Sequence, residues 1–278
     1  MAGDEGLFGS NSVTWRVHVE PIMWVAGLRA LYLQSLHPRV MRGTYQNSAL
    51  FDRKKAWARF LRTAEYVTIR TYGTTAETEA AGRRVRAIHS RLRGIDPETG
   101  ESFRLNEPDS LTWVHCAEID SYSHIAHRSG IITADETDQY IQENRASATL
   151  VGLSPEQVPG STADMDRYMR AQRDTLTTTP EALRGLLTSF NPPLPRHLAP
   201  LKLVVPAVNL LALSTLPKWA RRKLGVPVLP GADLVTTAQL RTLRAAGRLT
   251  LGDLDAAITQ ARDNAHRMAD GTFISILA

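Results

Sequence analysis

Apolar residues recur along this chain mainly at intervals of three and four, whereas strict alternation of apolar and polar residues is scarce. The first spacing puts apolar side chains on one face of an α-helix, and the second would indicate strands. The pattern therefore predicts an all-α fold. The expected helices cover residues 14–36, 52–72, 76–93, 108–128, 133–151, 163–176, 180–187, 201–216, 234–246 and 251–268.

Prolines, glycines and short acidic residues set the expected helix ends. Pro21 is expected to interrupt the first helix and Pro38 to end it, because proline disfavours helix in the residue before it. Asp52 and Asp233 are expected N-caps, since their carboxylates can accept from free backbone N–H groups. Gly247 is expected to end the helix that begins after Asp233.

Three segments outside the helix interiors contain sequence signals that predict their local structure. Residues 95–106 contain proline and glycine and predict a loop or short hairpin. Thr133 followed by Glu136 matches a capping box, which opens a helix. Residues 191–200 hold four prolines and predict an extended crossing segment.

Composition agrees with one globular body. The chain has 278 residues, of which 43% are hydrophobic and 22% charged, which is ordinary for a folded protein. We expect a single helical domain over 1–278, with 1–13 as a flexible N-terminus. The net charge of +5 is dispersed along the chain, so nucleic-acid binding is not favoured.

Cys116 is the only cysteine. It excludes an intramolecular disulfide and a cysteine-based zinc site, and it suits a reducing compartment. The N-terminus is acidic and lacks the basic start and apolar run of a secretory signal. Cytoplasmic residence is therefore expected.

The most apolar tract is 201–216, which Lys202, Pro206, Asn209 and Ser214 interrupt. It predicts a buried or partner-covered helix. The alternative is a weak membrane-surface contact through residues 201–224, because the tract ends in a basic and aromatic edge. The competing explanation for that edge is a helix C-terminus whose cations complement its dipole.

His89 has the most informative surroundings of the eight histidines. Arg86 and Arg93 lie three residues before and four after it, on the same helix face. Haem explains such a face, because its iron needs an imidazole nitrogen and its propionates need cations. The alternative is a solvated helix with a half-buried histidine.

Arg59, Arg62 and Thr63 form a second cluster. The arginines share a helix face beside a hydroxyl, which suits stabilisation of a bound oxygen species. The alternative is a surface helix with ion pairs between Glu65 and Arg62 or Arg70.

Several short motifs, in this order, resemble a known family: the haem-binding oxygenase superfamily that includes latex-clearing protein (rubber oxygenase) and the fungal mycophenolic-acid pathway oxygenase (MpaB-type). The resemblance covers roughly residues 15–159. It is carried by Gln34-Ser-Leu-His37-Pro38, Arg59-x-x-Arg62-Thr63, Tyr72-Gly73, Arg86-x-x-His89-x-x-x-Arg93-Gly94, Trp113-Val-His115-Cys-Ala-Glu-Ile-Asp120-Ser121, Tyr140-Ile-Gln-Glu143 and Gly152-Leu-x-Pro155.

The resemblance implies globin-like helix packing around a b-type haem, with His89 as the proximal iron ligand. Arg86 and Arg93 would orient that helix or meet the propionates. The distal side would hold the catalytic residues Arg59, Arg62 and Thr63. Three further positions, without assigned roles, join the cofactor-binding set: His37, Trp113 and His115.

One departure concerns Arg62, which stands where rubber oxygenases have a lysine that can cap the iron. A guanidinium stays charged and has no free lone pair, so a capped resting state is not expected here. Absence of an export signal favours a small intracellular substrate over an extracellular polymer.

The function expected is a haem b-dependent oxidoreductase (oxygenase, peroxidase or dehydrogenase) that uses dioxygen or peroxide on a small apolar substrate. Candidate bases are Glu65, Glu118 and Asp120. A thiolate ligand from Cys116 is disfavoured by its surroundings. The alternatives are a non-catalytic haem sensor or carrier and a cofactor-free helical interaction protein.

Overall fold

The computed structural model describes residues 3–52 and 54–272, and the all-α fold class is confirmed. Two short strands accompany the helices. The α-helices are α1 (Val13–His18), α2 (Met23–Gln34), α3 (Pro38–Asn47), α4 (Ala56–Tyr72), α5 (Thr75–Arg91), α6 (Pro108–Ser129), α7 (Ala134–Asn144), α8 (Thr162–Ala171), α9 (Pro180–Phe190), α10 (Val205–Ser214), α11 (Lys218–Lys223), α12 (Ala232–Leu251) and α13 (Leu254–Ala269). The 3₁₀ turns are η1 (Ala49–Phe51), η2 (Ala146–Val151), η3 (Pro155–Gln157), η4 (Gln172–Asp174) and η5 (Arg196–Leu203).

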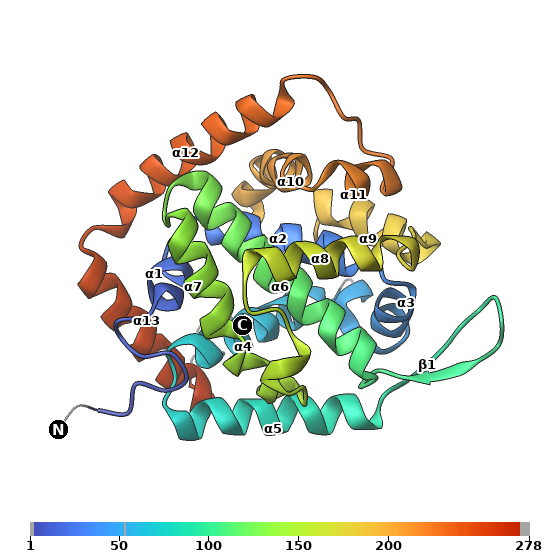
Figure 1. Ribbon diagram of the computed structural model, residues 1–278, viewed down its shortest axis with the longest axis horizontal. Coiled ribbons are helices and arrows are strands. Elements are labelled where there is room, and N and C mark those ends of the chain that lie inside the picture. Colours follow the sequence, from blue (N-terminus) through green and yellow to red (C-terminus); the bar gives the residue numbers. More distant parts are fainter. Residues whose placement is uncertain (1–2, 53, 273–278) are drawn as a thin grey trace.

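The core forms where α2 packs along α6, and it draws side chains from both ends of the chain. Leu33 of α2, Trp113 and Ile119 of α6 and Leu240 of α12 are fully buried there. Figure 1 shows α5 along the edge of the molecule opposite α10 and α11, with α12 and α13 wrapping one side. This arrangement leaves α4 and α5 as an adjacent pair whose inner faces meet α6 and η2.

The expected break at Pro21 is confirmed, because α1 ends at His18 and α2 begins at Met23. Pro38 ends the first helical stretch but also begins α3, which the sequence analysis missed. His37 is the N-cap of α3, and its Nδ1 accepts from the N–H of Val40. Proline is tolerated at a first helical position, since its missing N–H has no partner there.

The N-cap predicted at Asp52 is wrong. Asp52 follows η1, and its carboxylate accepts from the N–H of Lys54, 2.9 Å away. That local turn delays α4 to Ala56, as expected when an Asp side chain offers the backbone an alternative to helix. Gly73 ends α4 as predicted.

The bounds predicted for the helix near Asp233 are also wrong. Gly231 is the N-cap of α12 in the left-handed region, and Asp233 lies in the first turn, 3.3 Å from Arg221. Gly247 stays inside the helix, where it faces Pro21. A glycine inside a helix costs about 1 kcal/mol.

The three connections behave mostly as predicted. The loop or hairpin predicted for residues 95–106 is a hairpin of β1 (Arg93–Ile95) and β2 (Ser102–Arg104), and β1 begins at the last residue of the helix predicted over 76–93. A Cβ at Gly94 would lie 2.3 Å from Cζ of Phe103, so only glycine fits. The capping box at Thr133 is confirmed. The extended segment is correct up to Pro195 and wrong beyond it, where η5 begins.

Candidate active site

One stripe of α4 carries four polar side chains that range from exposed at Thr63 to buried at Arg70. Arg59, Thr63, Tyr66 and Arg70 follow one another at intervals of four, three and four, which aligns them on one helix face. Arg62 lies beside the stripe and is exposed. The stripe therefore runs from the half-buried Arg59 to the buried Arg70.

His89 lies on α5 and is half-buried. Its Nδ1 atom is buried and has no hydrogen-bond partner within the described residues. Burial, and then the charge of Arg59, lower the pKa of His89 below its usual value. The imidazole is therefore neutral near pH 7, which is the form that binds a metal.

Arg59 and Thr63 contact each other directly. Nη1 of Arg59 donates to Oγ1 of Thr63 over 2.7 Å. Burial and the neighbouring Arg62 lower the pKa of Arg59, and no described carboxylate pairs with it. A partly desolvated guanidinium without an acidic partner is suited to receive an anionic or strongly polarised group.

Arg86 anchors α5 to the turn η2. Its Nη1 donates to the carbonyls of Thr149 and Leu150, at 3.2 and 3.0 Å. Gly82 allows this close approach, because a Cβ there would lie 3.0 Å from Cδ2 of Leu150. Of the two roles expected for Arg86, these contacts match orientation of the histidine helix.

Arg93 caps the end of α5. Its Nη1 donates to the carbonyls of Ser90 and Leu92, at 2.9 and 3.0 Å, and the side chain is exposed. A cation at a helix C-terminus complements the last free carbonyls. Arg93 thus also supports the helix that carries His89.

Tyr66 and the ion pair Arg70–Glu118 were missed as a unit by sequence reasoning. Nη2 of Arg70 lies 2.7 Å from Oε1 of Glu118 on α6, and both are largely buried. The Tyr66 hydroxyl is buried and unpartnered within the described residues. The charges of Arg70, Glu118 and Arg86 influence its pKa. Burial raises the pKa of Tyr66, so the phenol keeps its proton and can donate it. The interval of seven from Arg59 to Tyr66 was the available signal.

His115 lies in the same interior region, on the α6 stripe that also holds Leu111 and Glu118. Burial lowers its pKa to about 4, with a partly opposing effect of Glu118 and a further lowering by Arg70. His115 is therefore a neutral imidazole near the Arg70–Glu118 pair. His115 and Tyr66 thus have Arg70 and Glu118 as common neighbours, and a role of His115 in cofactor binding stays a prediction.

His37 and Trp113 are placed elsewhere. His37 caps α3, and its Nε2 lies 3.3 Å from the carboxylate of Asp109. Trp113 is fully buried in the main core, and its ring lies 6.5 Å from that of Tyr168. No contact joins either of them to His89 within the described part of the chain.

The remaining candidates differ in their surroundings. Asp120 is 2.7 Å from Arg29 and therefore held in an ion pair. Burial raises the pKa of Glu65, and Glu118 is committed to Arg70. Burial and the charge of Asp120 raise the pKa of Cys116, which opposes the thiolate form that a metal would need.

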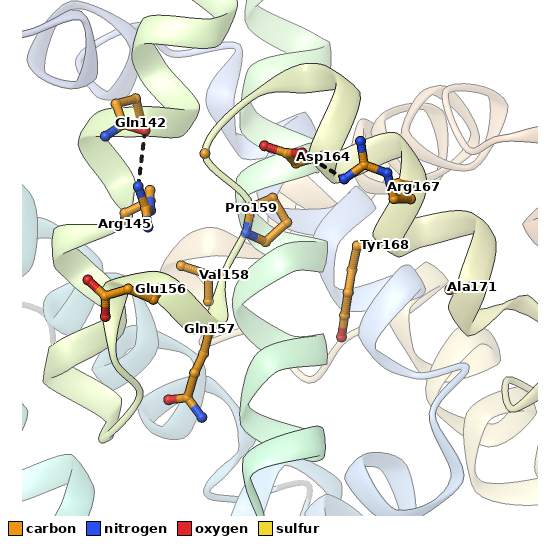
Figure 2. A pocket seen from close by; sticks show the side chains of 11 residues that line it. Gln142, Arg145, Glu156, Gln157, Val158, Pro159, Asp164, Arg167, Tyr168 and Ala171 are labelled. Carbon is orange, nitrogen blue, oxygen red and sulfur yellow. Dashed lines mark hydrogen bonds and ion pairs between the residues drawn. The ribbon is translucent and has the colours of Figure 1, made fainter.

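A separate groove of about 580 Å³ lies between η3, α7 and α8. Figure 2 shows Arg145, Arg167 and Tyr168 among its lining residues. None of the predicted site residues lines it. Tyr168 resembles Tyr66 in one respect, because its hydroxyl is also buried without a partner in the described chain.

The residues around His89 fit a haem better than a bare metal ion. No group of three or more His, Cys, Asp or Glu side chains within 3–52 and 54–272 could hold a metal. A haem needs only one imidazole, since the porphyrin supplies four nitrogens. The unpartnered Nδ1 of His89, the unpaired Arg59 and the free Tyr66 hydroxyl match an iron ligand, a cation and a hydrogen-bond donor.

These features define a helical protein with a half-buried imidazole beside cationic and hydroxylated side chains. Residues 15–250 match the family model of the ER-bound oxygenase mpaB/B'/rubber oxygenase catalytic domain. The chain belongs to this family, as the resemblance predicted, and carries an oxygenase catalytic domain. Neither a curated protein nor a solved structure matches it.

Within residues 3–52 and 54–272, no single helix is both long and apolar enough to cross a bilayer. The pair Arg196–Leu203 and Val205–Ser214, bent by 51°, meets the length and composition requirements.

Proposed function

We propose that this protein is a haem b-dependent oxidoreductase that uses dioxygen or peroxide to oxidise a small apolar substrate, with His89 as the iron ligand. The observation that carries the proposal is the neutral, half-buried imidazole of His89, with an unpartnered Nδ1, in a chain of the oxygenase family. Bound haem would supply the electron transfer to oxygen that amino-acid side chains cannot.

The chain's own residues then have distinct tasks. Arg86 and Arg93 fix α5 at η2 and at its C-terminus, which holds the His89 ring in place. Fixing a ligand by its surroundings is worth a large part of a site's affinity. Arg59, held by Thr63, is the cation whose charge lowers the pKa of the imidazole and can stabilise negative charge that develops beside it.

The side chain of Arg62 is exposed, which favours a role at the surface edge of the proposed site rather than in its interior. Its guanidinium has no lone pair for a metal. Unlike a lysine, Arg62 could not cap an iron that His89 would hold. This supports oxidant binding over a closed resting state.

Tyr66 supplies a proton donor deeper in the same region. The Arg70–Glu118 pair lies one turn further along α4 and holds that helix against α6. His115 beside the pair is neutral and can accept or relay a proton at a ring nitrogen. Oxygen chemistry commonly needs a proton donor and a proton acceptor, and Tyr66 and His115 would provide them.

The family name and the chemistry of apolar solutes support the substrate class. Rubber oxygenases, by their name, act on an apolar polymer, and the present chain shares their domain. A small apolar substrate would move from water into the protein interior without burying polar groups of its own that lack partners. The same fold also suits a haem sensor or carrier, which would bind haem without turnover.

The test begins with titration of the purified protein with haem, followed by absorption and by consumption of dioxygen or peroxide with a panel of small terpenoid substrates. A Soret band with substrate-dependent consumption is expected. A Soret band without consumption for any member of the panel would indicate the sensor or carrier. Absence of a Soret band after titration would contradict the haem proposal itself.

A further inference from the structure

Residues 182–232 contain no aspartate or glutamate, although the chain as a whole has 28 acidic residues. The stretch covers most of α9, all of η5, α10 and α11, and ends before Asp233. It also holds these basic residues: Arg184, Arg196, Lys202, Lys218, Arg221, Arg222 and Lys223. A stretch with cations only has a one-signed field, which favours a negatively charged partner.

Apolar side chains of the same stretch are exposed. Leu203 exposes 85% of its surface, Leu187 74% and Leu210 60%. We name the η5–α10 face after its exposed members Leu187, Leu201, Leu203, Val204 and Leu210. These residues lie in one region, because α10 contacts both α9 and η5, and Figure 1 shows α9, α10 and α11 gathered across the molecule from α5.

The opposite side of α10 holds the helix in the fold. Asn209 is buried, and its side-chain amide donates to the carbonyls of Ser189 and Val205, at 3.1 and 2.8 Å. Ala212 and Leu213 are buried in the core. Since this inner side fixes α10, the exposed leucines are not needed for packing. An outward face of a surface helix is normally polar, so a contiguous apolar one indicates an interaction site.

Four cations of this stretch are available to a partner. Arg196, Lys202, Lys218 and Arg222 are exposed, and none makes an ion pair with any described residue. Arg196 and Lys202 lie in η5 together with the exposed Leu201 and Leu203, whereas Lys218 and Arg222 lie in α11, which follows α10 along the chain. Leucines and unpaired cations in one segment match the two parts of an anionic lipid surface, an acyl boundary and a layer of phosphates. A symmetric dimer through this face would bring the cations of one copy to those of the other, which is unfavourable.

We propose that the η5–α10 face docks the protein onto the surface of an anionic lipid bilayer. The exposed leucines enter the boundary of the headgroups, and the four cations meet lipid phosphates. Docking is peripheral, because Ala212 and Leu213 hold α10 in the core, which keeps the bent pair of η5 and α10 at the surface of the fold. The proposal does not depend on haem binding, and its test requires no turnover.

The test is flotation of the full chain with phosphatidylcholine vesicles that contain or lack phosphatidylglycerol. The protein should float with the anionic vesicles, less so at high salt, and not with phosphatidylcholine alone. Leu203→Asp combined with Leu210→Asp should weaken the affinity for anionic vesicles at least about tenfold. Arg196→Glu combined with Lys202→Glu should weaken it by a similar factor.

The matched control is Leu249→Asp, at a leucine 87% exposed near the end of α12, which should float like the parent. Circular dichroism and size-exclusion chromatography establish that each variant is folded. Failure of the parent to float with anionic vesicles would overturn the proposal, as would unchanged flotation of the double leucine variant. A dimer that the leucine variant dissociates, in a chain that does not bind vesicles, would assign the face to a second copy and also overturn it.

Discussion

Arg59 on α4 and His89 on α5 are coupled across the two helices, because the charge of the guanidinium adds to burial in lowering the pKa of the imidazole. The coupling joins the two motifs that the sequence separates by 30 positions. It also means that a neutral ligand and a cation are present together at one place. A site with these two groups can hold an iron centre and stabilise negative charge beside it.

Replacement of Arg59 by glutamine should raise the pKa of His89 in the haem-free protein. The value should stay below 6.5, because burial is the larger cause of the shift. The measurement is a histidine NMR titration of both proteins. An unchanged His89 titration in the folded variant would show that the two side chains are not coupled.

The pH dependence of stability should include a contribution from His115. Its folded pKa of about 4 lies below the unfolded value of about 6.5. The unfolded state therefore binds the proton first as pH falls, so stability is lost between about pH 6.5 and pH 4, by roughly 3 kcal/mol in total. Urea unfolding at several pH values should show a smaller loss in His115→Gln than in the parent.

Other buried histidines also contribute to this loss, since burial lowers the pKa of His18 and His124. His115→Gln should thus reduce the slope of stability against pH without abolishing it. The exposed His127→Gln is the control and should keep the parent slope. Equal slopes for the parent and His115→Gln would contradict the burial of a neutral His115.

Tyr66 and Tyr168 form a matched pair, because each has a buried hydroxyl without a partner in the described chain. Tyr66→Phe and Tyr168→Phe should each leave the haem-free protein as stable as the parent or more stable by up to about 1 kcal/mol. Only Tyr66→Phe should weaken haem binding, by roughly threefold to tenfold for one lost hydrogen bond. Equal haem affinity of the two variants would remove Tyr66 from the site.

The buried pair of Arg70 and Glu118 should be costly to break from one side. Glu118→Gln leaves a guanidinium with 3% exposure unpaired and should destabilise the protein by about 3 kcal/mol or more. Arg70→Met combined with Glu118→Leu should recover much of that loss. Denaturation of Glu79→Gln, at the exposed pair Glu79–Arg83, provides the control, expected within about 0.5 kcal/mol of the parent. A double variant no more stable than Glu118→Gln would contradict this account of the pair.

Most helices of the fold could be predicted because residues close to their ends in the sequence determine where they begin or stop. Thr133 with Glu136, and Pro108 with Gly130, fix α7 and α6 through neighbours along the chain. The errors arose where the residue type allows more than one local structure. Asp52 accepts from the N–H of Lys54 instead of capping α4, and Gly247 lies inside α12 although glycine often ends helices.

The candidate site divides in the same way. The placement of Arg59, Thr63, Arg86 and His89 on two helices could be predicted from their spacing, whereas their roles in a site stay predictions. The roles of Tyr66 and the Arg70–Glu118 pair depend on how α6 approaches α4, which one sequence does not reveal. His37 and Trp113 share the motifs but lie at other contacts of the fold.

The most direct test of the central claim compares absorption spectra of haem-titrated parent, His89→Ala and His124→Ala. His124 is the matched control, because it is also half-buried and its Nε2 has no partner within the described residues. The account predicts a Soret band in the parent and in folded His124→Ala, and a band lost or shifted in folded His89→Ala, restored by added imidazole. A parent-like band in His89→Ala would contradict the assignment of His89 as the iron ligand.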